Sequence, residues 1–588
     1  MKRRLILVLS IGSWFAVAAL ATERYEVAVE RGVVAKMRDG VTLRADIYRP
    51  KAEGKFPVLL QRTPYDKRGA ADFGLKAAAR GYVVIVQDVR GRYASEGEWY
   101  TFRHESEDGY DTVEWAAALP YSNGKVGMFG GSYVGATQML AAIAAPPHLA
   151  GIFPVVTASN YHDGWTYQGG AFEQWFNESW TTGLAQDTLN RRAGREANPV
   201  LQWIGKLPLA SYPVLAADPE NLAPYFSDWL AHPSYDDYWK KLSIADHHDK
   251  VLAPAFHVGG WYDIFQGGTW RNYVGIKAHG GSDAARRGQR LIIGPWYHGP
   301  FDGRTGEVDF GPAARSADGK AFDTDEVMLR WYDYLLKGES NGTEREKPVK
   351  IFVMGENTWR EEDDWPLARA KNTRYFLHSG GHANSLMGDG TLSTEAPQAE
   401  PSDHFVYNPA EPVPTRGGGL CCDNERLASG AFDQRPVEAR NDVLVFTTPA
   451  FKQEFEVTGP LSLELYASSS AVDTDFTAKL VDVWPNGLAQ NLTDGILRAR
   501  FRNSQEKSEF MNPGEVYEFT IDLWATSNVF KAGHRLRLEV SSSNFPRFDR
   551  NLNTGEPAAF SSRVVKASNT VLHDREHPSA LILPIVPQ

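Results

Sequence analysis

The chain has 588 residues, of which 42% are hydrophobic and 23% are charged, and its formal net charge at pH 7 is −11. Its length suggests about four domains or fewer, and its apolar content suffices for more than one core, which excludes the disordered and fibrous classes. Because the chain is acidic and no Lys/Arg-dense tract follows its first few residues, the sequence argues against a nucleic-acid partner.

The first 21 residues have the features of an export signal. Residues 2–4 are basic, residues 5–18 are apolar, and residues 19–21 (Ala-Leu-Ala) form a cleavage site of the small-x-small type. The mature chain would then start near Thr22, in a periplasm or outside the cell. The alternative is an uncleaved membrane anchor, but the apolar stretch is shorter than the roughly 20 residues that a spanning helix needs. We therefore expect no membrane span after cleavage.

Residues 22–160 alternate short apolar runs with amphipathic segments, and the runs are bounded by Gly, Pro or charged residues. The expected strands are residues 43–48, 56–61, 82–87 and 126–129. The expected helices are residues 73–80, 105–119 and 132–145. This alternation predicts the first part of a mostly parallel sheet with helices on both faces.

The alternation stops in residues 161–250, which are rich in aromatic residues, and we expect an inserted helical cap there. Apolar runs typical of buried strands return at residues 255–258 and 289–293. We therefore expect residues 251–355 to form the second part of the same α/β domain. One domain would thus be split by an insertion.

Residues 356–588 have a different pattern, in which apolar residues alternate with polar ones. Leu461, Leu463 and Leu465, for example, alternate with Ser462 and Glu464. A period of two is typical of half-buried antiparallel strands, and many such strands with long connections predict an all-β domain of the jelly-roll kind.

The only two cysteines, Cys421 and Cys422, are adjacent in this all-β region. Two neighbours do not make a disulfide framework, and a bond between them would be strained. No His/Cys cluster with metal-ligand spacing accompanies them. We therefore expect two packed thiols rather than a redox or metal site, although the sequence does not fix their redox state.

The strongest local signal for chemistry is Val-Gly-Met-Phe-Gly-Gly-Ser-Tyr-Val-Gly at residues 126–135. A strand, a tight turn of small residues and a helix would form a nucleophile elbow that lifts the Ser132 hydroxyl to the carboxyl end of the sheet. Val134 stands where the strict G-x-S-x-G pattern has its second Gly. A Gly-Gly-Ser turn that caps an ordinary helix is therefore the alternative.

Two later strand ends supply partners for Ser132 in the chain order of α/β-hydrolases, which is nucleophile, acid and then histidine. The strand at residues 255–258 leads to Asp263, and the strand at residues 289–293 leads to His298. His298 would act as the general base, and Asp263 would fix its tautomer and stabilise the imidazolium. The alternative is a loop Asp and a loop His with surface roles.

Five motifs, taken together, resemble the cocaine esterase and cephalosporin (glutaryl) acylase family of serine hydrolases, which is related to the Xaa-Pro dipeptidyl peptidases. The motifs are Arg-Thr-Pro-Tyr-Asp-Lys at 62–67, Asp-Val-Arg-Gly-Arg at 88–92, Gly-Gly-Ser-Tyr-Val-Gly at 130–135, Gly-Gly-Trp-Tyr-Asp at 259–263 and Gly-Pro-Trp-Tyr-His-Gly at 294–299. The resemblance spans nearly the whole mature chain. It implies an α/β-hydrolase domain with a helical cap and a C-terminal jelly roll, and an elbow of the form G-x-S-Y-x-G.

The resemblance also implies further site residues. Tyr65 would donate its hydroxyl to the oxyanion, and the backbone N–H of Tyr133 would supply the second donor; the alternative for Tyr65 is a core aromatic at a strand end. Cap aromatics line the acyl pocket in the family, which makes Trp165 and Trp180 candidates, with plain core packing as their alternative. The motif at residues 88–92 is interpreted as a structural ion-pair loop near the site.

We therefore expect an exported serine hydrolase that cleaves small-molecule esters, and amides as a further class, through an acyl-enzyme, with no metal or cofactor. A dipeptidyl peptidase of the Xaa-Pro type is the second hypothesis, for which Glu173 or Glu178 of the cap would have to bind the substrate ammonium. A third is an inactive, hydrolase-like carbohydrate-binding protein, since lectins share the jelly-roll architecture. The sequence allows a homo-oligomer but specifies no interface, and it does not identify the natural substrate.

Overall fold

The computed structural model describes residues 25–193, 203–211, 222–315 and 321–587. The expected export signal lies outside these ranges. Among the described helices, none is both long enough and apolar enough to cross a membrane.

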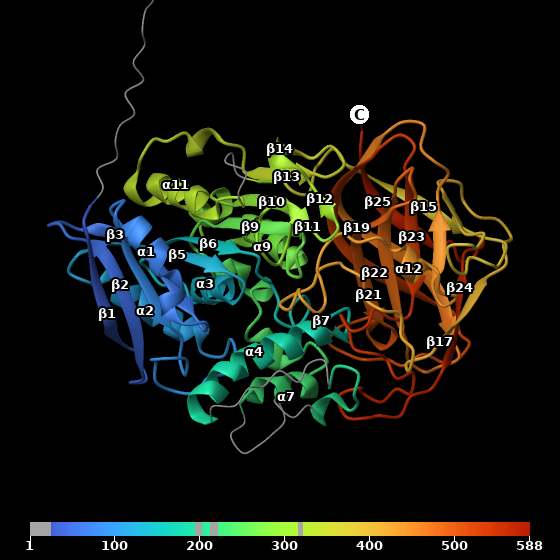
Figure 1. Ribbon diagram of the computed structural model, residues 1–588, viewed down its shortest axis with the longest axis horizontal. Coiled ribbons are helices and arrows are strands. Elements are labelled where there is room, and N and C mark those ends of the chain that lie inside the picture. The colour runs from blue at the N-terminus through green and yellow to red at the C-terminus, as the bar shows by residue number, and fades with distance from the viewer. Residues whose placement is uncertain (1–24, 194–202, 212–221, 316–320, 588) are drawn as a thin grey trace, which may run out of the picture.

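A mixed sheet of ten strands forms the first half of the molecule (Figure 1). Its strands, in spatial order, are β1 (Val27–Lys36), β2 (Thr42–Pro50), β4 (Val83–Asp88), β3 (Phe56–Thr63), β5 (Ser122–Gly131), β6 (Leu149–Val155), β9 (Phe256–Tyr262), β10 (Arg290–Tyr297), β13 (Val349–Val353) and β14 (Thr358–Glu362). The run from β4 to β13 is parallel, and β1, β2 and β14 add antiparallel edges. The carboxyl ends of the parallel strands therefore meet at one edge.

Helices cover both faces of this sheet. The helices of the domain are α1 (Ala71–Ala78), α2 (Glu105–Ala117), α3 (Tyr133–Ile143), α9 (Gln266–His279), α10 (Asp283–Arg287) and α11 (Thr324–Lys337), and a small hairpin consists of β11 (Arg304–Thr305) and β12 (Val308–Asp309). Val58 and Leu60 of β3 pack in one core with α2 and α3, whereas Leu59 packs in another core with α1 and α11. This alternation follows from the period of two along a strand.

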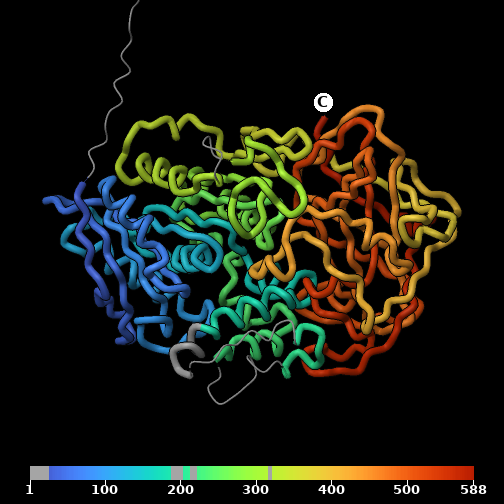
Figure 2. The backbone as a smooth tube through the Cα atoms, in the orientation of Figure 1, coloured from blue at the N-terminus to red at the C-terminus, as the bar shows by residue number. Residues whose placement is uncertain are grey.

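The cap lies between β6 and β9 in the chain. It contains the hairpin of β7 (Tyr167–Gln168) and β8 (Ala171–Phe172) and the helices α4 (Gln174–Ala193), α7 (Pro224–Ala231) and α8 (Asp237–Lys240). Figure 2 shows the cap below the junction of the two large lobes, in teal and green. Backbone bonds tie it to the all-β domain, as from Trp175 N to Pro546 O at 3.0 Å.

The second lobe is an antiparallel all-β domain. Its strands are β15 (Lys371–His378), β16 (Thr391–Ser393), β17 (Asp403–Tyr407), β18 (Leu444–Thr447), β19 (Phe455–Ser469), β20 (Asp475–Val483), β21 (Ala489–Arg498), β22 (Tyr517–Phe530), β23 (Arg535–Ser541), β24 (Ala567–Leu572) and β25 (Ala580–Val586), with the short helix α12 (Arg435–Glu438). One β16–β18 bridge is parallel. Leu461, Leu463 and Leu465 point into its core, as their alternation predicts.

The observed architecture confirms the predicted fold class, an α/β-hydrolase sheet with an inserted cap and an all-β C-terminal domain. The two sheets meet directly, because Met354 at the end of β13 exchanges backbone hydrogen bonds with Ser527 and Val529 of β22 at 3.0 and 2.8 Å. The expected boundary at residue 355 falls in the turn between β13 and β14, so the hydrolase sheet continues to Glu362.

Candidate active site

Ser132 occupies the sharp turn between β5 and α3. Its backbone lies at φ 59° and ψ −127°, a region that non-glycine residues rarely adopt and that costs about 1 to 3 kcal/mol. A Cβ at Gly130 would approach Val134 Cγ1 to 2.3 Å, and one at Gly135 would approach Thr157 Cβ to 2.8 Å. The small residues around Ser132 thus permit this close approach, and the turn has the form of a nucleophile elbow.

Asp263 and His298 lie at the ends of the neighbouring strands β9 and β10, where parallel pairing brings them together. His298 Nδ1 is 2.8 Å from Asp263 Oδ2, and the Asp263 side chain is fully buried. The other carboxylate oxygen accepts a hydrogen bond from the backbone N–H of Phe265 at 2.6 Å. Both oxygens of Asp263 are therefore engaged, which fixes the orientation of the imidazole and leaves its Nε2 for another partner.

Tyr65 lies just after β3 and faces Ser132. The indole Nε1 of Trp180 donates to the Tyr65 hydroxyl at 2.9 Å. The Ser132 side chain lies close enough to lower the pKa of this hydroxyl. Although 40% of the Tyr65 residue is exposed, burial around its hydroxyl raises the pKa to about 12, against the opposing effect of Trp180 and Ser132. The phenol therefore keeps its proton at neutral pH and can donate it to an oxyanion.

The four groups thus reach one edge of the sheet, where a hydrogen bond joins Asp263 to His298 and Tyr65 lies close to Ser132. Within the hydrogen-bond network of the described residues, no bond joins Ser132 to His298. In hydrolases such bonds often become short only when the substrate is in place, so this geometry is compatible with a triad.

Tyr133 is the first residue of α3. Its hydroxyl donates to Glu105 Oε1 at 3.0 Å and accepts from the backbone N–H of Phe102 at 2.8 Å, so its buried side chain is anchored below the site. An N–H at the first position of a helix has no partner within the helix. The backbone N–H of Tyr133 is therefore available beside Ser132.

The two cap tryptophans are buried against the site. Trp180 is 6% exposed, stacks on Tyr133 with ring centres 5.9 Å apart, and contacts Tyr65 directly. Trp165 is fully buried and stacks on Phe265 at 4.3 Å, and Phe265 in turn meets the His298 ring edge to face at 5.2 Å. The structure thus places Trp180 next to Tyr65 and Trp165 one ring away from His298.

The motif at residues 88–92 forms ion pairs next to the loop that carries Tyr65. Asp88 pairs with Lys67 at 2.8 Å, and Arg90 pairs with Asp108 at 2.6 Å. Arg92 Nε donates to the carbonyl of Pro64, the residue before Tyr65, at 2.9 Å. These contacts hold the loop that carries Tyr65.

The sequence analysis missed two parts of the site. Phe265, two residues after Asp263, links the cap to His298. The second part is residues 417–422 of the all-β domain, which pass so close that a Cβ at Gly419 would lie 3.2 Å from the Asp263 carbonyl oxygen. Three consecutive glycines before Cys-Cys were the available signal for this close approach.

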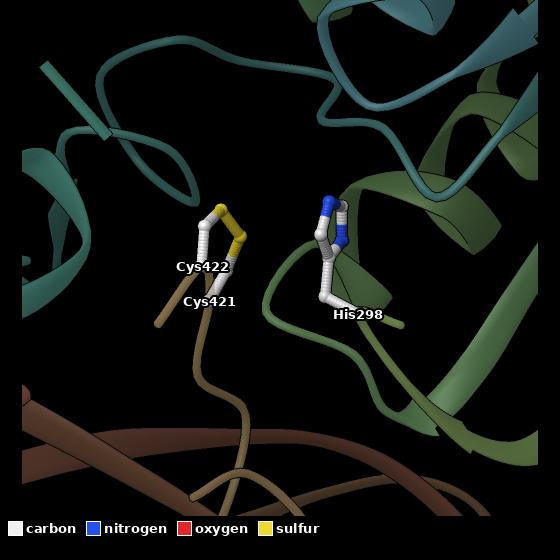
Figure 3. A group of neighbouring side chains, drawn as sticks. All are labelled: His298, Cys421 and Cys422. Atoms are coloured by element: carbon white, nitrogen blue, oxygen red, sulfur yellow. A yellow bond between two sulfur atoms is a disulfide. The ribbon is translucent and has the colours of Figure 1, made fainter. Parts of the chain in front are cut away.

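The expectation of two free thiols is wrong, because Cys421 and Cys422 are joined by a disulfide. The strain expected between neighbours did not exclude the bond. The two sulfurs and a ring nitrogen of His298 all lie within 4.8 Å of one another (Figure 3). The sequence around the two cysteines contains no histidine with metal-ligand spacing. The histidine beside them in the structure, His298, belongs to the hydrolase domain and is more than a hundred residues away in the chain.

Comparisons with known proteins agree with this geometry. Residues 39–300 match the family model described as X-Pro dipeptidyl-peptidase (S15 family), and residues 341–582 match the X-Pro dipeptidyl-peptidase C-terminal non-catalytic domain. A cocaine esterase from Rhodococcus sp. (strain MB1 Bresler) is 39% identical over 582 residues, which cover 95% of this chain and 99% of that esterase. The chain belongs to the cocaine esterase family of serine hydrolases.

Two solved structures show how far this family architecture extends. The crystal structure of an aminopeptidase from the marine sediment archaeon Thaumarchaeota archaeon has a TM-score of 0.82 at 27% identity and covers 98% of this chain and 99% of its own. An α-amino acid ester hydrolase has a TM-score of 0.78 at 25% identity, with coverages of 97% and 98%. The family assignment thus agrees with the resemblance in the five sequence motifs, and the chain is a serine hydrolase.

Proposed function

We propose that the protein is an exported carboxylesterase that hydrolyses esters of small apolar acyl groups through an acyl-enzyme. The observation that carries this proposal is that Ser132, Tyr65 and the hydrogen-bonded Asp263–His298 pair all follow strand ends at the carboxyl edge of one sheet. Export is supported by the signal-like features of residues 1–21.

In this mechanism the Ser132 hydroxyl attacks the ester carbonyl while His298 Nε2 takes its proton, and Asp263 stabilises the imidazolium that forms. The oxyanion receives hydrogen bonds from the Tyr65 hydroxyl and the Tyr133 backbone N–H, and such donors are worth about 3 to 4 kcal/mol each in the transition state. His298 then protonates the departing alcohol. Water attacks the acyl-enzyme by the same route and restores Ser132.

The surroundings of the four groups favour an uncharged acyl group. Trp165, Trp180 and Phe265 belong to one apolar cluster that also includes Leu420 and Cys421 of the all-β domain. Apolar walls of this kind bind apolar groups and exclude water from the acyl-enzyme.

A substrate ammonium, which dipeptidyl peptidases must bind, would need a free carboxylate near Ser132. Burial raises the pKa of both Glu173 and Glu178 to about 8, so both are mainly protonated at neutral pH. Glu173 also faces Arg547 at 3.7 Å. The two cap carboxyls are therefore poor ammonium ligands, and the esterase ranks above the peptidase.

The first experiment compares the mature protein with Ser132→Ala on p-nitrophenyl acetate and butyrate, a glutaryl amide, and the p-nitroanilides of Ala-Pro and Gly-Pro. We expect turnover of the esters that is lost in the variant, and labelling of Ser132 by a fluorophosphonate. Preferential cleavage of the Xaa-Pro anilides would instead support the peptidase. No turnover together with no labelling would exclude a serine hydrolase mechanism and favour a binding protein.

A further inference from the structure

The Cys421–Cys422 disulfide lies beside His298, although the two come from different domains (Figure 3). Both sulfurs and a ring nitrogen of His298 are within 4.8 Å of one another. Cys421 is 1% exposed and lies in the apolar cluster of the site, whereas Cys422 is exposed. The disulfide thus joins a buried residue to an exposed one, and a small reductant would approach it from the side of Cys422.

Two thiolates and one imidazole nitrogen are a ligand set that binds zinc, with water as the fourth ligand. Ligand atoms within 4.8 Å of one another need only small side-chain rotations to meet around one ion. Zinc-binding histidines typically donate their other N–H to a carboxylate, which orients the ring. His298 has this arrangement already, because Asp263 holds its Nδ1 at 2.8 Å and leaves Nε2 for a metal.

We propose that reduction of the Cys421–Cys422 disulfide creates a zinc site with His298 and thereby inhibits the hydrolase. A dithiol or phosphine reductant supplies the two electrons that break the S–S bond, and two protons complete the thiols while the reductant is oxidised. Zn²⁺ then displaces both protons and takes the Nε2 lone pair of His298. In the oxidised form the sulfurs are bonded to each other, and Nε2 stays free to act as a base.

The inhibition rests on the proposed function, but the metal site does not, so metal binding is measured separately from activity. The full mature chain is titrated with Zn²⁺ against a chromophoric chelator, and with Co²⁺ by absorption, in the disulfide form and after reduction and removal of the reductant. We expect stoichiometric Zn²⁺ and thiolate-to-cobalt charge-transfer absorption in the reduced form alone. Ester hydrolysis by that form should fall about tenfold or more on adding Zn²⁺ and return with a chelator.

Two variants make the test decisive. The double variant Cys421→Ser/Cys422→Ser should bind no Zn²⁺ in the same titration, and its own ester hydrolysis, whatever its starting rate, should respond neither to reduction nor to Zn²⁺. Its midpoint of thermal unfolding shows that it folds. In His298→Asn the reduced protein should bind Zn²⁺ about 10- to 100-fold more weakly, a readout that needs no activity.

Three outcomes would overturn the zinc site: reduced wild-type protein that binds no more Zn²⁺ than the double variant, an unchanged affinity in His298→Asn, or equal binding by the disulfide form. Zinc binding that leaves ester hydrolysis unchanged would overturn the inhibition. If the disulfide form hydrolyses no ester, the proposed function fails, while the metal titration still decides the zinc site.

Discussion

The two sides of the active site are built in different ways. On the side of the hydrolase sheet, Ser132, Asp263 and His298 each lie just after the end of a strand. The strands of Asp263 and His298 are neighbours, and β6 separates them from the strand of Ser132. On the opposite side, Trp180 of α4 and Cys421 of the all-β domain reach the site from segments outside the sheet. The positions of Ser132, Asp263 and His298 are thus set by the ends of strands in one sheet. The positions of the side chains around them are set by the packing of the cap and the all-β domain on that sheet.

The largest effect should follow from a change on the sheet side. Asp263→Asn keeps the size of the side chain and an oxygen for the Phe265 N–H, but it favours the wrong tautomer of His298. We expect kcat for p-nitrophenyl acetate to fall about 10⁴-fold, as it does for the equivalent change in a serine protease triad. As a control, exposed Asp309→Asn, also after β10, should change kcat less than about twofold. A small effect of Asp263→Asn would remove this carboxylate from the mechanism.

Tyr65→Phe should have the next largest effect. It removes one proposed oxyanion donor and keeps the ring, so we expect kcat to fall about 10²- to 10³-fold while KM changes little. Because the pKa of Tyr65 is raised to about 12, its proton should be retained and the pH–rate profile should show no loss from this group below that pH. A rise in KM with an unchanged kcat would assign Tyr65 to packing or substrate binding.

Trp180→Phe tests the opposite side of the site. The variant loses the Nε1–H that donates to Tyr65 but keeps an aromatic ring against Tyr133, so kcat should fall about fivefold, the equivalent of about 1 kcal/mol. Trp175→Phe is the matched control: it is a buried tryptophan of the same helix whose Nε1 has no partner among the described residues. If Trp180→Phe is as damaging as Tyr65→Phe, the division between the two sides fails.

The smallest effect on activity is expected from Glu178, which is buried in α4 with Gln174 as its hydrogen-bond donor. The pKa of Glu178 is raised from 4.5 to about 8. Between these two pH values the folded protein keeps the Glu178 proton, whereas the unfolded chain has lost it. The free energy of unfolding therefore falls as the pH rises from 4.5 to about 8. Glu178→Gln should therefore stabilise the protein by about 2 to 4 kcal/mol near pH 8.5 and by much less near pH 5.

The measurement for Glu178→Gln is the midpoint of thermal unfolding at both pH values, with exposed Glu53→Gln as the control. Glu53→Gln should show no gain, and the gain of Glu178→Gln should be much larger at the higher pH, with ester hydrolysis unchanged. An equal gain at both pH values would mean that the pKa of Glu178 is not raised in the folded protein.

The positions of Ser132, Asp263 and His298 at strand ends could be predicted from the sequence, because the signals for them are local; their catalytic roles stay a prediction. The elbow around Ser132 needs small residues within a few positions, and Asp263 and His298 directly follow recognisable apolar strands. The alternation of Leu461, Leu463 and Leu465 likewise indicated the all-β domain. In each case a pattern within a few residues of the chain is enough to indicate where the side chains lie in the fold.

The rest of the site depends on contacts between segments far apart in the chain. The bond between Cys421 and Cys422 and its position beside His298 follow from the packing of the all-β domain on the hydrolase sheet. The contact between Phe265 and Trp165 follows from the placement of the cap. Neither contact leaves a periodic pattern. The three glycines at residues 417–419 indicate a close approach, but they do not indicate which segment is approached.

The backbone hydrogen bonds between Met354 and β22 imply that the hydrolase domain cannot be separated from the all-β domain without loss of contacts. A fragment that ends before the all-β domain would lose the backbone partners of Met354 and uncover Gly267, which packs against Trp524. It would also lack Gly419, the residue that lies against Asp263. During synthesis Ser132, Asp263 and His298 emerge before this second domain, so the contacts of Asp263 with Gly419 and of Met354 with β22 can form only after the all-β domain has been made.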